Sequence, residues 1–211
     1  MTPLLPKSRL EAFSDGVLAI VITIMVLEMK APHTAEGAIP AIHDLAPVLP
    51  KFVAYVLSFV YVGIYWSNHH HLLHATRSVT GGTLWANLHL LFWLSLIPFT
   101  TSWMGECGFE SIPVALYGLN LLGCAGSWDI LRRLLVRHHP PDSELVRAIK
   151  QGSKEWISLS LYVSGLLCSL LLDGEGGHGG HGRWIALFLF AVVAAIWLVP
   201  DRRIERALAS H

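Results

Sequence analysis

Residues 9–30 (RLEAFSDGVLAIVITIMVLEMK) form the stretch that most limits what this chain can fold into. As an α-helix it would be about 33 Å long, at about 1.5 Å per residue, which is close to the thickness of a bilayer core. The part from Gly16 to Leu27 carries no charge, whereas Arg9, Glu11 and Asp15 lie in the first half. Ionisable groups inside a membrane helix usually serve a function, so we expect this helix to do more than anchor the chain.

Two faces are predicted for this helix when successive residues are placed about 100° apart. One face is an apolar stripe formed by Phe13, Ile20, Ile24 and Leu27. Thr23 lies at the margin of this stripe, and Asp15 points roughly to the opposite side. We expect Ser14 and Asp15 to bind groups on neighbouring helices, because an unpaired polar group in hydrocarbon costs several kcal/mol.

The composition is that of an integral membrane protein. Of the 211 residues, 53% are hydrophobic and 14% are charged, against about 25% charged in ordinary soluble domains. The formal net charge of +0 gives no reason to expect nucleic acid as a partner. Cys107, Cys124 and Cys168 are far apart and lack CxxC spacing, so we interpret them as packing residues. We expect no cleavable signal peptide, because the first apolar run is too long for one.

Six apolar segments predict an all-α protein with six transmembrane helices per subunit and a single membrane domain, residues 1–211. The expected helices are about 9–30, 51–74, 83–104, 112–132, 155–172 and 183–199. We expect Pro98 to kink the third helix. If the N-terminus is cytoplasmic, all but three of the 15 Lys and Arg residues lie on the cytoplasmic side, the exceptions being Lys30, Lys51 and Arg183. The positive-inside rule therefore predicts that both termini are cytoplasmic.

The string Arg9-x-x-x-Phe13-Ser14-Asp15 resembles a family signature at the start of a first membrane helix. The family is that of the endosomal and lysosomal potassium channels called transmembrane protein 175, in their bacterial six-helix branch. The run Tyr65-Trp66-Ser67-Asn68-His69-His70 is similar to the end of the family's second helix. Asn87 and Ile97-Pro98-Phe99 are similar to its third helix. The resemblance covers about residues 7–105, and beyond them only the hydropathy pattern agrees.

The resemblance implies a homotetramer in a lipid bilayer whose four first helices line a central pore. Ile20, Ile24 and Leu27 would then form an apolar constriction, and Thr23, together with Ile20, would favour K⁺ over Na⁺. The motif residues would form a polar network joining the first helix to the second and third: Arg9, Phe13, Ser14, Asp15, Trp66, His69, His70 and Asn87. The implied function is a potassium-preferring leak channel with a hydrophobic gate in the plasma membrane of a bacterium. It would have K⁺ as the permeant ion and no cofactor.

Selectivity is expected to be modest, because the sequence has no TVGYG-like carbonyl filter. Neck diameter, hydration and the Thr23 hydroxyls would have to supply it. Glu28 directly follows Leu27 and is a candidate for attracting cations to the outer mouth. The alternative for Glu28 is a solvated helix end without a role in permeation.

Three other interpretations stay open at this stage. His70 and His74 are spaced to share a metal ion, but no carboxylate or cysteine lies at ligand spacing, so we favour structural hydrogen bonding and expect no metal. A secondary transporter would have broken helices near the midplane and internal repeats, and we find neither in the sequence. A membrane-embedded enzyme could use Asp15 with the histidines of the second helix, but no nucleophile or metal set completes such a site.

Overall fold

The computed structural model describes residues 7–32, 39, 41–76, 79–137, 154–172 and 180–198. Every regular element within these ranges is a helix. Most of the loops expected at 142–154 and 173–182, together with both ends of the chain, lie outside the described residues. The predicted positions of the termini concern residues outside these ranges.

The helices follow the predicted order. They are α1 (Lys7–Leu27), the 3-10 helix η1 (Ile42–Val48), α2 (Leu49–Ala75), α3 (Gly81–Ser95), α4 (Ile97–Glu106), α5 (Ser111–Val136), α7 (Lys154–Leu171) and α8 (Gly182–Leu198). With α3 and α4 taken as one interrupted helix, the described residues form six long helical units, as predicted. Four of these units are long and apolar enough to cross a membrane, and α8 is a shorter apolar helix. The chain therefore has the helices of a multi-pass membrane protein.

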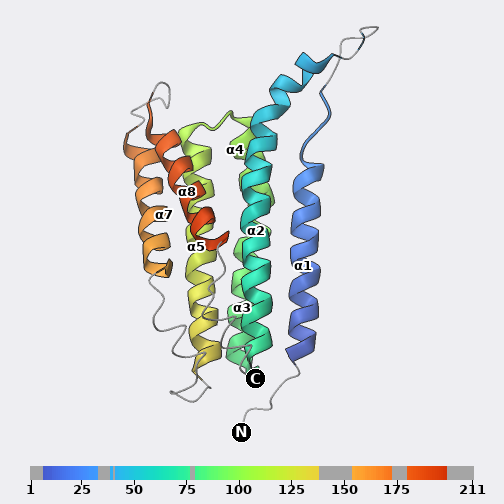
Figure 1. The fold of residues 1–211 in the computed structure, drawn as a ribbon, viewed down its shortest axis with the longest axis vertical. Helices are drawn as coiled ribbons and strands as arrows, with labels where there is room; N and C mark the ends of the chain where they lie inside the picture. Colours follow the sequence, from blue (N-terminus) through green and yellow to red (C-terminus); the bar gives the residue numbers. More distant parts are fainter. Residues whose placement is uncertain are drawn as a thin grey trace.

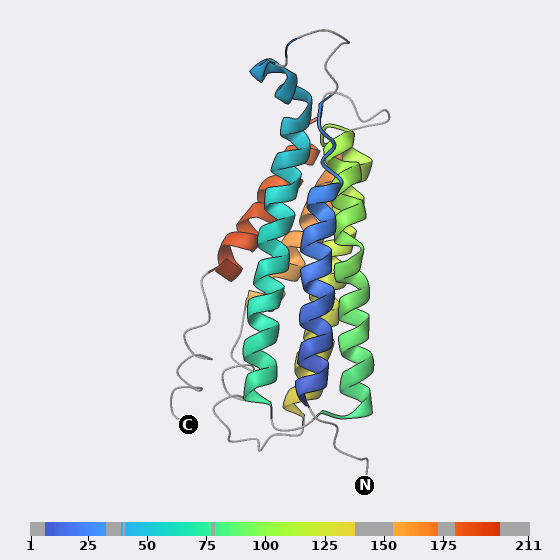
Figure 2. The ribbon, with the colours of Figure 1, turned by 90° about the vertical axis from the view of Figure 1, so that its right-hand side faces the viewer.

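The helices run roughly parallel to the long axis of the molecule, with α1 at one edge and α7 at the other (Figure 1). α1 packs against α2, α3 and α4, while α7 and α8 pack against each other and against α5. In the view from the side, α1 lies at the front of the bundle between α2 and the α3–α4 pair (Figure 2). One side of α1 is therefore left on the surface of the single chain.

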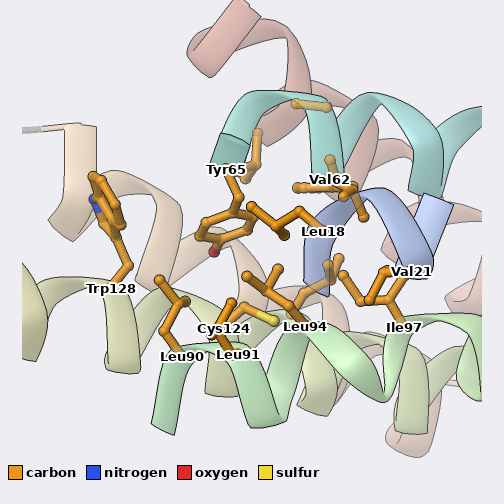
Figure 3. Close-up of a cluster of buried hydrophobic side chains, with 14 of the residues drawn as sticks. Leu18, Val21, Val62, Tyr65, Leu90, Leu91, Leu94, Ile97, Cys124 and Trp128 are labelled. Carbon is orange, nitrogen blue, oxygen red and sulfur yellow. The ribbon is translucent and has the colours of Figure 1, made fainter. Parts of the chain in front are cut away.

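The apolar core joins α1 to the middle of the bundle. Leu18 and Val21 of α1 lie beside Val62 and Tyr65 of α2 and Leu94 of α3 (Figure 3). All of these side chains are buried. Their burial fixes the rotation of α1 about its own axis, and this rotation decides which of its residues face outward.

Glycines allow the last helices to approach closely. The ring of Phe190 on α8 lies against Gly118 of α5 and Gly165 of α7, where an added Cβ would come within 2.5 and 2.6 Å of the ring. Small residues of this kind are typical of membrane interfaces, because helices there associate through close packing and not through the expulsion of water. α5, α7 and α8 thus form one side of the bundle, away from α1.

The kink expected at Pro98 is an interruption of the helix at Leu96, where α3 ends and α4 begins. Proline has no amide hydrogen, and its ring collides with the carbonyl group four residues earlier. Asn120 of α5 bridges the interruption. With its amide turned so that both ends are satisfied, its nitrogen donates to Trp93 O at 2.9 Å and its oxygen accepts from Ile97 N at 3.2 Å. The backbone groups released by the interruption are therefore hydrogen-bonded inside the protein, as a membrane requires.

Helix boundaries differ from the predicted ones by a few residues. α1 ends at Leu27 and not at Lys30. α3 begins at Gly81, two residues before the expected start, because Thr80 caps it: the Thr80 hydroxyl accepts from Thr83 N at 3.4 Å, and the Thr83 hydroxyl donates to Thr80 O at 2.7 Å. Such a cap satisfies amide groups that the first turn of a helix leaves free.

Candidate functional site

The apolar stripe predicted on α1 lies on the surface of the chain. The exposed fractions of Phe13, Ile20, Ile24 and Leu27 are 53%, 58%, 40% and 75%. The face of α1 that packs against the bundle is a different one, formed by Leu10, Ser14, Leu18, Val21 and Met25. A second apolar face on a helix that is already packed requires a second apolar neighbour, which is either lipid or another protein surface.

Ser14 is the polar residue in the packed face of α1, and it is fully buried. Its Oγ accepts a hydrogen bond from Asn87 Nδ2 of α3 at 2.9 Å. Asn87 Oδ1 lies 2.7 Å from His69 Nε2 of α2, where the imidazole must donate because an amide oxygen only accepts. The three side chains are no more than 2% exposed. One chain of hydrogen bonds therefore joins α1, α2 and α3.

Asp15 forms a second connection between α1 and α2, nearer the surface. Trp66 Nε1 donates to Asp15 Oδ1 at 3.1 Å. The Trp66 ring stacks on His70 with 6.3 Å between centroids, and His70 stacks on His74 at 6.2 Å. Of the two adjacent histidines assigned to the network, His69 thus carries the buried hydrogen bond, while His70 is exposed and contacts Trp66 through its ring.

Arg9 and Phe13, the other two residues of the motif, are exposed. Within the described part of the chain, the Arg9 guanidinium forms no ion pair, with Asp15 or with any other carboxylate. The cation that ties the start of α1 to α2 is Lys7, whose Nζ donates to His74 O at 3.1 Å and to Leu73 O at 3.4 Å. We did not predict this contact, although a lysine next to the carbonyl groups that end a helix is a recognised favourable arrangement.

Thr23 and Glu28 lie toward the other end of α1. Thr23 Oγ1 donates to Ile20 O at 2.9 Å, so the hydroxyl hydrogen is used within the helix and the oxygen keeps its capacity to accept or to bind a cation. Glu28 Oε2 accepts a hydrogen bond from Ser102 Oγ of α4 at 3.4 Å. Both residues are exposed in the single chain.

No group of three or more His, Cys, Asp or Glu side chains within the described ranges is arranged to hold a metal ion. His70 and His74, the pair whose spacing allows a shared metal, instead have nearly parallel rings, with an angle of 18° between them. Among the described residues, no third ligand is therefore available for a metal ion shared by His70 and His74.

A cluster of charged residues connects α5 to α7. Asp129 pairs with Arg132 at 2.8 Å and with Arg133 at 2.6 Å, and Arg132 also pairs with Glu155 of α7. The spacing of Asp129 to the two arginines, three and four residues along the helix, places all three side chains on one face. The contribution of Glu155 was not predicted, because a long connection separates it from α5 in the sequence. The sequence did place a carboxylate at the start of an apolar helix. A charge in such a position usually needs a partner, and this was the available signal for the pair.

Known proteins resemble this chain in sequence. Residues 9–98 match the profile of the family described as endosomal/lysosomal potassium channel TMEM175. A potassium channel from Chryseobacterium sp. (strain P1-3) is 48% identical over 205 residues, which cover 97% of this chain and 99% of that protein. The human endosomal/lysosomal proton channel TMEM175 is 37% identical over 98 residues, which cover 42% of this chain and 19% of the human protein.

The fold is also similar to that of a solved channel structure. It is the crystal structure of a lysosomal potassium-selective channel TMEM175 homolog from Chamaesiphon minutus. The TM-score is 0.75 at 24% sequence identity, and the match covers 92% of this chain and 97% of that one. The arrangement of helices described above is therefore shared with this channel structure.

Proposed function

The chain belongs to the TMEM175 potassium channel family, and on that premise we propose that it forms a potassium-preferring cation leak channel. Four copies would assemble around an axis lined by α1. The channel would lie in the plasma membrane of a bacterium with both termini in the cytoplasm. The observation that carries the proposal is the exposed apolar stripe on α1, a helix at the edge of the bundle that packs against α2, α3 and α4 through a different face.

Four stripes facing one axis would form a narrow apolar neck. Ile20, Ile24 and Leu27 follow one another at intervals of about one helical turn, so their rings would extend the neck over about 10 Å. Such a neck can close sterically or by losing its water, which is a known way to gate an ion pathway. The stripe would also be protected from lipid on all sides, which accounts for its exposure in a single chain.

Thr23 would supply the polar group nearest the neck. Its hydrogen is bonded to Ile20 O, so the side of the hydroxyl left for a permeating ion is the oxygen, which attracts cations. Four hydroxyl oxygens would replace part of the hydration shell of K⁺, and together with Ile20 they would set the preference for K⁺ over Na⁺. No carbonyl filter of the TVGYG type is present in the sequence, so the expected preference remains modest.

The polar network would hold the stripe in position. Ser14 lies about one and a half turns before Ile20 on the same helix, and its bond to Asn87 limits the rotation of α1. The bond of Trp66 to Asp15 holds α1 on another side. A rotation of α1 would break both bonds while moving the stripe, so the network couples the neck to α2 and α3.

The two alternative functions, a membrane-embedded enzyme and a secondary transporter, have less support. The relatives are channels and not enzymes. The structure does contain one broken helix, which is a feature of many transporters. However, the polar groups at this break bind Asn120, whereas a transporter would turn them toward a substrate cavity.

Reconstitution of the full chain into liposomes tests the proposal. Potassium flux should follow the membrane potential, should not saturate and should require no coupled ion, and it should exceed sodium flux under the same gradient. Ile20→Asn widens and wets the neck, so it should raise the current and reduce the preference for K⁺. A matched proton-gradient assay would show whether this chain also conducts protons, since the human relative is a proton channel.

Val26→Asn serves as the control, because Val26 is also exposed on α1 but lies on another face. It should leave the current and the ion preference close to those of the wild type. Native mass spectrometry of the purified protein should give four copies per particle. A wild-type current that Ile20→Asn leaves unaltered, or a monomeric particle that conducts, would contradict the proposed pore.

A further inference from the structure

A cavity lies on the side of the bundle away from α1, between α2, α5, α7 and α8. It has a volume of about 30 Å³. Most of its wall is apolar, but its lining also includes Asp129, Glu155, Asn68 and Ser158. None of these residues belongs to the exposed stripe or to the hydrogen-bond network around Ser14, so the cavity is separate from the proposed pore.

The charged cluster beside the cavity leaves one carboxylate oxygen, on Glu155, as an acceptor for a donor-bearing ligand. The side chains of Asp129 and Glu155 are 16% and 14% exposed, and both pair with Arg132, which is 12% exposed. Asp129 uses its second oxygen to bind Arg133, whose side chain is 63% exposed. Glu155 has one oxygen on Arg132, while its Oε2 is buried and has no hydrogen-bond partner among the described residues. A buried carboxylate oxygen of this kind is costly unless a donor approaches it.

Further acceptors surround the same space. Asn68 Nδ2 donates to Ile64 O at 2.8 Å, so its amide oxygen is left as an acceptor. Ser158 Oγ donates to Lys154 O at 2.7 Å and accepts from Trp197 Nε1 at 2.8 Å, and it keeps one lone pair. A ligand with several N–H or O–H donors on one atom would satisfy Glu155 Oε2 together with one or both of these groups.

Aromatic rings form much of the remaining wall. They belong to Tyr61, Tyr65, Trp128, Tyr162 and Trp197. Tyr65 and Trp128 meet edge to face, with 6.3 Å between their centroids. Aromatic rings attract an ammonium group that lies over their faces within about 6 Å, and they pack well against the carbon attached to it. An alkali ion instead needs a shell of oxygen ligands, which a mostly apolar wall does not supply.

We propose that this cavity binds the head of a primary ammonium ion, R–NH₃⁺. Its three N–H groups would bind Glu155 Oε2 and the acceptors of Asn68 and Ser158, and its first carbon would lie against the rings. A volume of about 30 Å³ holds one or two water-sized groups, so it admits the nitrogen and the first carbon. A quaternary ammonium with four methyl groups is too large.

A primary ammonium can come from a soluble amine or from the headgroup of an ethanolamine lipid. Both carry the same group, and the charged cluster around Arg132 lies at the end of α5, where the lipid headgroups are expected. The chemistry of the cavity is the same in the two cases. Two arms of the experiment distinguish the two sources.

The first arm uses the full-length protein in nanodiscs of phosphatidylcholine, at constant ionic strength in sodium buffer at pH 7. Methylammonium, ethylammonium and tetramethylammonium are titrated separately, and binding is followed by saturation-transfer NMR. Methylammonium and ethylammonium should bind saturably, and tetramethylammonium should bind at least tenfold more weakly.

In the second arm, the thermal unfolding midpoints of the protein are compared in vesicles with and without phosphatidylethanolamine, without added amine. A higher midpoint with phosphatidylethanolamine identifies the lipid as the source, and equal midpoints identify a soluble amine.

Two variants locate the binding. Glu155→Gln removes the charge of the carboxylate, and Ala125→Leu fills the cavity while it keeps every charged residue. Each should weaken methylammonium binding at least tenfold. Ala125→Leu retains the ion pairs of α5 and α7, so it preserves the test if Glu155→Gln does not fold. Glu106→Gln is the matched control, since Glu106 pairs with Lys51 away from the cavity, and it should leave binding unaltered.

The experiment distinguishes binding in the cavity from binding in the proposed pore. Ammonium ions could also enter the proposed pore, and binding there would survive Ala125→Leu. Methylammonium binding that Ala125→Leu leaves intact, or equal binding of tetramethylammonium, would overturn the proposal. Absence of saturable methylammonium binding to the wild type would do the same. Potassium flux through the Ala125→Leu variant should match that of the wild type, because Ala125 is outside the pore.

Discussion

Asn87 of α3 donates a hydrogen bond to Ser14 of α1 at 2.9 Å, at a position where both side chains are fully buried. The same amide lies 2.7 Å from His69 of α2. Three helices thus meet at one asparagine, and α1, which packs on only one side of the bundle, depends on this contact more than a central helix would. The rotation of α1, and with it the direction of Ile20, depends on this contact together with the Trp66–Asp15 bond and the burial of Leu18 and Val21.

Ser14→Ala should therefore destabilise the protein. It removes the acceptor of the Asn87 amide and leaves a buried donor without a partner, which costs about 1–3 kcal/mol. Thermal unfolding followed by intrinsic fluorescence would show the loss. Ser95→Ala is the control, because Ser95 is exposed and, among the described residues, its hydroxyl binds Phe92 O of its own helix. Equal midpoints for the two variants would contradict the role assigned to Ser14.

The Trp66–Asp15 bond should show energetic coupling. Trp66→Phe keeps an aromatic ring against His70 but removes the indole donor, and Asp15→Asn weakens the acceptor. Measured together in a double-mutant cycle, the two changes should interact by about 0.5–1.5 kcal/mol. Denaturant unfolding in a fixed detergent gives the four stabilities that the cycle needs. Full additivity would mean that the 3.1 Å contact contributes nothing to stability.

The features of the fold and of the site that the sequence predicts are those that depend on residues close together in the chain. The helices and the stripe on α1 were predictable, because hydropathy and the helical period are local properties. The interruption before Pro98 was predictable for the same reason. The bridging of that interruption by Asn120 was not, because it depends on the distance between α3 and α5.

The choice between His69 and His70 shows the same limit. The two residues are neighbours in sequence and about 100° apart around α2, so their roles depend on how α2 is rotated. The core contacts of Val62 and Tyr65 set this rotation and turn His69 toward Asn87. Glu155 and Arg132 are likewise brought together by the packing of α5 against α7, which no local pattern encodes.

Gly123→Ala should weaken the contact between α3 and α5. An added Cβ would lie 2.4 Å from Cδ2 of Trp93, and the ring is also held by a hydrogen bond from its Nε1 to His89 at 3.1 Å. Overpacking of this kind costs about 1–3 kcal/mol. Gly126→Ala, on the same helix, meets nothing within 4 Å and should be neutral or slightly stabilising, since alanine favours helices. A comparison of the two thermal midpoints tests the prediction, and a Gly123→Ala midpoint at or above that of Gly126→Ala would contradict it.

Glu28→Gln should reduce the potassium conductance at low salt. Glu28 follows the last residue of α1, and in the proposed tetramer four such carboxylates would surround the mouth of the pore and raise the local concentration of cations. Salt screens this attraction, with a Debye length of about 30 Å at 0.01 M and about 3 Å at 1 M. Single-channel conductance should therefore fall about twofold near 0.01 M K⁺ and remain the same near 1 M. Glu28→Asp keeps the negative charge at the same position, so it should have little effect at either concentration. If Glu28→Gln changes the conductance equally at both concentrations, or at neither, Glu28 is a solvated helix end and not a cation-attracting ring.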